Sequence, residues 1–200
     1  METQQKTDRR AMRSKRLIIQ AWRELVLEKE YKKITVSDIV ERADIGRATF
    51  YAHFEDKEDL GRYLFQQLLA QIEAQIQAIL DENPSDNDRA QQLVPSLALF
   101  RITEEKFPWF KMNATKPDTG LVMLIKPLVL RMERELDAMN LPPRSDEVST
   151  QMIAQFLISG LISLLTDWVV NDMPSPPEEM DRLYHSLAEP IIDRLLGVAA

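Results

Sequence analysis

The stretch that decides the fold is ITVSDIVERADIGRATFYAHF, residues 34–54. Its first half has the i, i+3, i+4 and i+7 apolar spacing of a short amphipathic helix, at Val36, Ile39, Val40 and Ala43. Thr35 precedes this pattern and Asp38 follows three residues later, which is the spacing of a capping box. The sequence therefore predicts a helix that begins just after Thr35.

Asp44-Ile45-Gly46 follows and predicts a tight turn, because Asp tolerates left-handed backbone angles and Gly adopts almost any. A second short helix is predicted over residues 47–54, with Phe50 and Phe54 buried beneath it. Ile45 would then fill the corner between the two helices. Two short helices joined by such a turn form a helix-turn-helix.

The outward face of the second helix indicates what the motif binds. Helical geometry places small or polar side chains opposite the two phenylalanines, namely Ala48, Thr49 and Ala52, with Tyr51 and His53 on the flanks. Residues 47–54 include no acidic side chain. Such a helix suits a DNA major groove, where Arg47 can read guanine and small apolar groups can contact a thymine methyl. A helical corner of a globular protein, with no role in DNA binding, is the alternative.

TVSDIVERADIGRATFYAHFEDKEDL, residues 35–60, resembles the DNA-binding domain of TetR-type transcriptional regulators. The resemblance extends over roughly residues 10–62 and includes the T-F-Y-x-H-F and D-K-E-x-L patterns. It implies an all-α homodimer. An N-terminal three-helix DNA-binding domain, residues 1–56 with the helix-turn-helix at about 35–54, would precede a helical regulatory, ligand-binding and dimerisation domain, residues 57–200.

The resemblance also implies roles for nine positions. It assigns base edges to Arg47, Ala48 and Ala52, phosphates to Thr49, Tyr51, His53 and Lys57, and either backbone or base to Thr35 and Ser37. This chain departs from the usual Gly-Val-Ser turn of the family, so that Gly46 replaces Ser as the N-cap of the second helix. It also has Glu30 where the first helix often ends in Gly. Neither departure removes a phosphate-contacting residue.

The charge is divided unevenly along the chain. The formal net charge is −7 at pH 7, yet residues 1–54 contain 12 Lys and Arg against 8 Asp and Glu. The remainder contains 13 against 24. A basic N-terminal part directs that end toward phosphates, while the acidic remainder is repelled. The absence of cysteine excludes disulfides, thiolate metal sites and cysteine nucleophiles.

The N-terminus, METQQKTDRRAMRSKR, lacks the apolar core of a signal peptide, so we expect a cytoplasmic protein. Its basic side chains predict a phosphate or minor-groove contact, the alternative being a solvated tail: Arg9, Arg10, Arg13, Lys15 and Arg16.

Apolar spacing predicts helices beyond the motif as well. We expect them from about residue 8 or 10 to 28, over 57–80, 91–106, 121–139 with a kink or break at Pro127, 152–170, and 177–196 with a kink at Pro190. A linker is expected at 81–88, and an irregular segment bracketed by residues 107–110 and 116–120. The helix over 57–80 would link the DNA-binding part to the body.

Residues 152–170 match a membrane span in length, but several polar residues interrupt them and no basic flank follows. We therefore expect a helix buried on nearly every side, and no membrane. Such burial implies a partner helix from a second subunit. With residues 177–196 it would form a four-helix dimer interface, although packing within one chain also fits the spacing.

Several aromatic and methionine side chains are candidates for an effector pocket, each being ordinary core on the alternative interpretation: Phe100, Trp109, Met123, Phe156 and Trp168. Residues 156–180 loosely resemble a TetR subgroup that includes regulators of dihydroxyacetone kinase operons. The family implies a ligand-responsive repressor that binds a palindromic double-stranded DNA operator as a homodimer and answers to a small-molecule effector. The alternative is an activator or adaptor that a protein partner controls.

An enzyme is the competing class of function. The sequence has two histidines, His53 and His185, which would have to meet across domains. It has no Gly-rich phosphate loop and no metal-ligand spacing of His, Asp and Glu. We therefore expect no catalytic residues, no metal and no cofactor.

Overall fold

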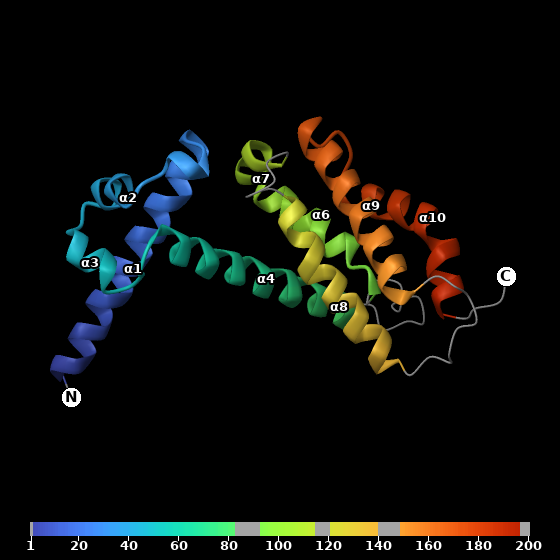
Figure 1. The fold of residues 1–200 in the computed structure, drawn as a ribbon, viewed down its shortest axis with the longest axis horizontal. Helices are drawn as coiled ribbons and strands as arrows, with labels where there is room; N and C mark the ends of the chain where they lie inside the picture. The colour runs from blue at the N-terminus through green and yellow to red at the C-terminus, as the bar shows by residue number, and fades with distance from the viewer. Residues whose placement is uncertain (1, 83–92, 115–120, 140–148, 197–200) are drawn as a thin grey trace. The chain divides into compact units, whose positions relative to one another are not determined.

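The computed structural model describes residues 2–82, 93–114, 121–139 and 149–196, and within these ranges the regular elements are helices joined by turns (Figure 1). The all-α prediction is therefore confirmed for the part of the chain that is described. Contacts divide the chain into two compact units, Met1–Ala70 and Gln71–Ala200. The predicted domain boundary after residue 56 coincides with the start of a long helix, α4 (Lys57–Glu82), and stays a prediction.

The first unit holds the predicted helix-turn-helix and the helix that supports it. Its elements are α1 (Glu2–Glu28), η1 (Tyr31–Lys33), α2 (Val36–Arg42), α3 (Arg47–Tyr51) and the first part of α4. Helix α1 packs against α2 and α3, which also pack against each other. The apolar stripe of each helix supplies the core, including Ile18, Leu25, Ile39, Phe50 and Leu60, all fully buried.

Local sequence signals position α2 and α3. The capping box is confirmed: the Asp38 amide donates to Thr35 Oγ1 at 3.2 Å, and the Thr35 amide donates to Asp38 Oδ2 at 2.8 Å. Asp44 takes the left-handed conformation, with φ of 51°. Helix α3 ends at Tyr51 and not at residue 54 as predicted, because the His53 amide donates to the Phe50 carbonyl and tightens the chain into a turn.

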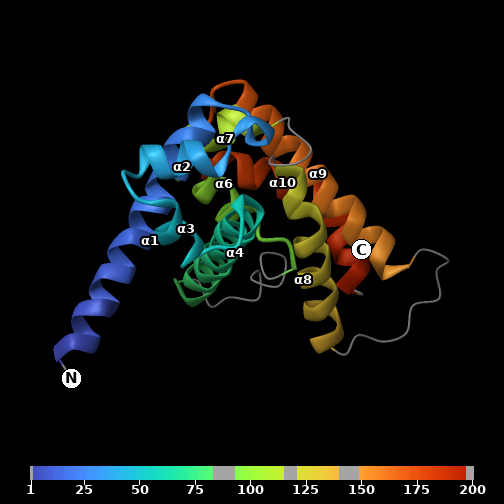
Figure 2. The same cartoon turned by 60° about the vertical axis from the view of Figure 1, so that its left-hand side comes forward.

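The second unit is built around α9 (Thr150–Val170). This helix packs against α6 (Ser96–Glu105), α7 (Phe107–Asn113), η2 (Leu121–Leu124), α8 (Ile125–Ala138) and α10 (Pro177–Leu196). Figure 2 shows α8 and α9 running along each other in this unit. One face of α9 is fully buried, including Ala154, Ile158, Leu161 and Leu165.

Helix α9 is the one described helix whose length and composition would suit a membrane span. Its contacts with five other elements make it the central core helix of its unit. Its N-terminus is capped by Ser149, which accepts a hydrogen bond from the Met152 amide at 3.2 Å.

Prolines account for most differences from the predicted elements. Helix α6 begins at Ser96, later than predicted, because Pro95 occupies the N-cap. The segment predicted to be irregular between residues 107–110 and 116–120 is helical over its first part, α7, since Pro108 is tolerated in a first helical turn. The predicted break near Pro127 is the change from η2 to α8 after Leu124.

Of two further helices, one has the limits predicted from the sequence and the other is longer than predicted. Helix α10 has the predicted limits, with Pro190 inside it. Helix α1 is longer than predicted, since it begins at Glu2. Most of the predicted linker at 81–88, and residues 116–120, which bound the predicted irregular segment, lie outside the described residues.

Candidate nucleic-acid interface

Helix α3 presents a small and uncharged face next to one arginine. Arg47, Ala48, Tyr51 and Ala52 are exposed, while Thr49 is half-buried. Tyr51 is 53% exposed, and its ring edge rests on Phe50 with the ring centroids 5.5 Å apart. A helix with small side chains and no acidic residue can enter the major groove without steric or electrostatic conflict. The structure thus places four predicted contact residues on α3, namely Arg47, Ala48, Thr49 and Tyr51, and a fifth, Ala52, at its C-cap.

Arg47 is held by a residue of the other motif helix. Its Nη2 atom donates a hydrogen bond to the Ser37 hydroxyl at 2.6 Å, and both side chains are exposed. The bond crosses the turn between α2 and α3. Two predicted DNA-contacting residues are therefore in direct contact.

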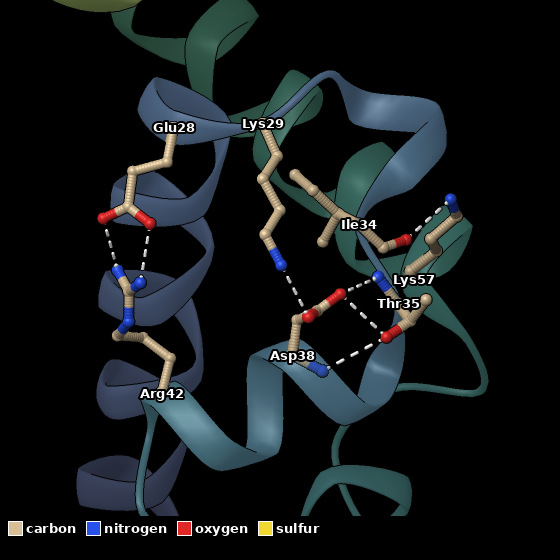
Figure 3. Close-up of polar contacts among 7 residues, drawn as sticks. All are labelled: Glu28, Lys29, Ile34, Thr35, Asp38, Arg42 and Lys57. Atoms are coloured by element: carbon tan, nitrogen blue, oxygen red, sulfur yellow. Dashed lines mark hydrogen bonds and ion pairs between the residues drawn. The ribbon is translucent and has the colours of Figure 1, made fainter.

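The N-terminus of α2 is fixed to α1 through Asp38 (Figure 3). Lys29 Nζ donates to Asp38 Oδ1 at 2.7 Å, and the Thr35 hydroxyl donates to Asp38 Oδ2 at 2.8 Å. The hydrogen bond from Lys29, followed by those from Thr35, lowers the pKa of Asp38 to about 2. Thr35, which is exposed, is thereby held in one orientation at the predicted interface.

The C-terminus of α2 is fixed to α1 through Arg42. Its guanidinium donates to both carboxylate oxygens of Glu28, at 3.0 and 2.7 Å (Figure 3). It also donates to Glu24 at 3.3 Å. The hydrogen bond from Arg42 lowers the pKa of Glu28. Such a bidentate pair fixes the angle between two helices as well as their contact. The sequence does not indicate this pair, because no local spacing relates residues 28 and 42.

His53 and Lys15 each contact other side chains of the first unit. The Nε2 atom of His53 lies 2.7 Å from the Ser14 hydroxyl of α1, and burial, followed by the charge of Lys15, lowers the pKa of His53. Lys15 Nζ lies 3.9 Å from the ring centroid of Tyr63 and 5.5 Å from that of Phe54. The contacts predicted between DNA and these two residues stay predictions. Ser14 is a contact that the sequence did not indicate.

Lys57 is also engaged. Its Nζ donates to the backbone carbonyl of Ile34 at 2.9 Å (Figure 3). It also donates to the carbonyl of Tyr31 at 3.3 Å. It also lies 5.0 Å from the centroid of the Tyr31 ring. This ammonium therefore joins the start of α4 to the segment before α2. A phosphate contact by Lys57, as the sequence predicts, would be made beside these bonds or in exchange for them.

The remaining basic residues of α1 are open to solvent. Four arginines toward the N-terminus of α1 are exposed: Arg9, Arg10, Arg13 and Arg16. Their predicted contact with phosphates or the minor groove is a prediction still.

Two family models match the chain. The model of the bacterial regulatory proteins of the tetR family matches residues 18–64, which include α2 and α3. A second, described as a transcriptional regulator C-terminal region, matches residues 112–190. The chain belongs to the TetR family. Its helix-turn-helix, residues 35–54, lies within the part that the first of these models matches.

Two proteins described as HTH-type regulators share parts of the sequence. The chain is 38% identical over 72 residues to the HTH-type transcriptional regulator YxbF of Bacillus subtilis, which is 36% of this chain and 19% of that protein. It is 34% identical over 59 residues to the dhaKLM operon transcriptional activator DhaS of Lactococcus lactis, 30% of this chain and 32% of that one. The matched part thus spans about a fifth and a third of these relatives.

Three solved structures share the fold over nearly the whole chain. The fatty acid degradation regulator FadR from Bacillus halodurans aligns with a TM-score of 0.62 and 19% identity, over 92% of this chain and 95% of that one. The dihydroxyacetone kinase operon activator DhaS aligns at 0.56 and 17%, over 91% and 96%. A TetR regulator from Streptococcus agalactiae aligns at 0.56 and 24%, over 90% and 96%.

The effector-pocket candidates of this TetR-family chain fall into two groups. Phe100 and Trp168 are buried together, edge to face with centroids 5.2 Å apart, and Trp168 Nε1 donates to the Ser175 carbonyl at 2.9 Å. Trp109 is half-buried. Met123 and Phe156 are exposed, so the structure does not gather them with the first pair. Their role in ligand binding stays a prediction.

A partly buried polar cluster, which the sequence did not indicate, joins α6 to α10. The hydroxyl of Ser96 donates to Asp181 and lies 3.0 Å from His185 Nε2. Ser96 is fully buried, so no substrate can approach its oxygen in this arrangement. Burial lowers the pKa of His185, opposed by the charges of Asp181 and Glu189. We interpret the cluster as a polar contact within the core of the regulatory unit.

Proposed function

We propose that the protein is a transcriptional repressor that acts in the cytoplasm. It binds a two-fold symmetric operator as a homodimer and leaves it when a small effector binds the regulatory unit. The observation that carries this proposal is the exposed face of α3, where Arg47 stands beside the small side chains Ala48 and Ala52.

Each recognition helix reads one half-site. Arg47 contacts a guanine, Ala48 and Ala52 meet base edges, and Thr49 and Tyr51 bind phosphates, which fix the register but carry no sequence information. Ser37 and Thr35, at the start of α2, approach the same groove. His53 and Lys57 add phosphate contacts. Each of them then gives up some of its present contacts within the chain.

A second copy of the chain covers an apolar surface on α9 and α10. Met152 and Phe156 are 63% and 66% exposed and lie four residues apart, on one face of α9. Leu183 and Leu187 are 44% and 68% exposed and are likewise four residues apart on α10, which packs against α9. Large apolar side chains grouped in this way support a protein–protein interface. Two helices from each chain would form a four-helix contact.

The effector acts by preferring one of two conformations. A ligand that binds better to a form with the wrong half-site separation shifts the population away from DNA. The aromatic pair Phe100 and Trp168, with Trp109, lies in the unit that would respond. Helix α4 is the covalent route from that unit to the DNA-binding unit, because it contributes residues to both.

An activator controlled by a protein partner is the second candidate. Its support is the likeness to DhaS, whose name describes an activator of an operon, both in sequence over 59 residues and in fold. In that case the α3 face has the same role in DNA binding. The sign of regulation and the nature of the controlling partner differ.

The first test is a selection from genomic DNA fragments with the purified protein at fixed, near-physiological salt. We expect recovery of a two-fold symmetric site with half-sites about one helical turn apart. Binding that depends on salt but selects no motif would contradict operator recognition.

A second test separates repression from activation. A reporter gene placed behind the recovered site is measured with and without the protein. Lower expression with the protein present supports the repressor, and higher expression supports the activator.

A further inference from the structure

The two arginines of the helix-turn-helix that face solvent have opposite surroundings. Arg42, at the end of α2, is held by the two carboxylates of Glu28 and Glu24. Its charge is balanced and its donors are largely occupied. Arg47 makes no ion pair with any residue that the structure describes, and its one hydrogen-bond partner there is the neutral hydroxyl of Ser37.

Because the Ser37 hydroxyl is neutral, its hydrogen bond with Arg47 does not balance the charge of the arginine. The guanidinium offers five N–H donors in a rigid plane, and Ser37 occupies one of them. The positive charge is left uncompensated, and the other edge of the plane is free to form a bidentate pair. That is the geometry with which arginine recognises the O6 and N7 atoms of guanine.

The hydrogen bond to Ser37 also restricts the conformations of the Arg47 side chain. A free arginine side chain loses much rotamer entropy when it binds. The bond of 2.6 Å between Arg47 Nη2 and Ser37 Oγ removes part of that freedom before DNA arrives. Ser37 is the second residue of α2 and Arg47 the first of α3, so the backbone of each end is fixed by its helix.

We infer that Ser37 is a positioning residue which determines the base that Arg47 reads, by holding its guanidinium in one orientation across the turn. The inference rests on the proposed function and assigns to Ser37 a role in specificity that acts through Arg47. A direct contact between Ser37 and DNA would instead affect binding without Arg47.

The test compares four full-length variants with the wild type by binding-site selection and sequencing at fixed salt: S37A, S37T, R47A and S37A/R47A. R47A should lower the preference at one symmetric pair of operator positions by about fivefold or more, the loss of a bidentate base contact. S37A should lower the preference at the same positions by about two- to tenfold, the effect of one hydrogen bond. S37T keeps the hydroxyl and should retain the preference.

The double variant decides between the two roles of Ser37. If Ser37 acts through Arg47, S37A should have no further effect on base preference in the R47A background. A uniform loss of affinity for all sequences in S37A, or an effect that persists in the R47A background, would overturn the inference. Circular dichroism and thermal unfolding should be unchanged in S37A, because Ser37 is exposed.

The outcome also distinguishes this inference from the proposed function. A wild-type protein that selects no sequence would contradict operator recognition itself and the inference with it. A wild-type protein that selects a symmetric site while S37A retains the full preference would overturn only the role of Ser37.

Discussion

The ammonium nitrogen of Lys57, the first residue of α4, donates a hydrogen bond to the carbonyl of Ile34 at 2.9 Å. The amide of the same peptide group, that of Thr35, donates to Asp38 at 2.8 Å. One peptide unit is thus bound at both ends, by α4 and by the capping box of α2.

Replacing Lys57 by methionine keeps the length of the side chain and removes its donors. We expect the free energy of unfolding to fall by about 1–3 kcal/mol, because hydrogen bonds from a charged group to half-buried carbonyls are lost. Chemical denaturation followed by circular dichroism measures the change. Lys33→Met is the matched control, since the one ion pair that Lys33 makes among the described residues is with Glu30 at the surface. A Lys57→Met protein as stable as the wild type, with weaker DNA binding, would show that phosphate contact is the main role of Lys57.

Gly46 is the N-cap of α3 and makes no side-chain hydrogen bond to the helix. Its φ of −74° suits any residue, and a Cβ atom added there meets nothing within 4 Å. Gly46→Ser should therefore raise the free energy of unfolding by about 0.5–1 kcal/mol, through a new cap and a less flexible unfolded chain. Thermal unfolding checks the gain. Gly46→Ala, which adds Cβ without a cap, should gain less, and an equal gain would refute the capping argument.

Tyr51→Ala should weaken binding to every DNA sequence by a similar factor, because the resemblance assigns Tyr51 to phosphate. Folding should remain intact, since the ring is more than half exposed and touches Phe50 only by an edge. Titration of specific and random DNA at one salt concentration measures the first effect. Circular dichroism measures the second, and a Tyr51→Ala protein that does not fold would show that the ring belongs to the core.

Phe156→Glu should convert a dimer into a monomer, because a charge would be placed within the apolar surface of α9 and α10. Sedimentation equilibrium over a range of concentrations measures the association. Leu130→Glu is a matched control, since Leu130 is 50% exposed on α8, outside that surface. A wild-type protein that is monomeric at micromolar concentration would contradict the dimer, as would equal effects of the two substitutions.

The stability of the protein should decrease as the pH falls below about 6.5. Burial lowers the pKa of His185 in the folded state below its usual 6.5, so the unfolded chain binds more protons in this range. The contribution of the neutral histidine is complete above pH 6.5 and is lost as the pH falls toward the folded-state pKa. Denaturation between pH 8 and 5 measures the slope, and His185→Gln should reduce it. An unchanged slope would show that His185 does not titrate differently in the two states.

The sequence predicts those features of the motif that depend on near neighbours. Thr35 and Asp38 are three residues apart, and Phe50 and Phe54 four, so one helical turn brings each pair together. The contacts that fix α2 on α1 could not be predicted in this way. Arg42 and Glu28 meet only because two helices cross at a particular angle, which no local spacing specifies.

The same limit applies to Lys57, which the resemblance assigns to phosphate. Its hydrogen bonds are to backbone carbonyls, and every residue has a carbonyl, so the sequence contains no signal for them. For the effector-pocket candidates, the sequence does not show which side chains are buried and which are exposed. Phe100 and Phe156 are alike in composition, yet one is buried and the other exposed, and only their helices' packing separates them.

Helix α4 contributes residues 57–70 to one compact unit and residues 71–82 to the other. A continuous helix couples length to rotation, since each residue adds about 1.5 Å and about 100°. One residue inserted near Ala70 would turn the DNA-reading end about the axis of α4, whereas seven would nearly restore its azimuth and displace it by about 10 Å. If the protein binds an operator as the proposed dimer, the number of residues in α4 would therefore affect the spacing of half-sites that it recognises. Regulators assembled by exchanging such units would have to conserve helical phase at the junction.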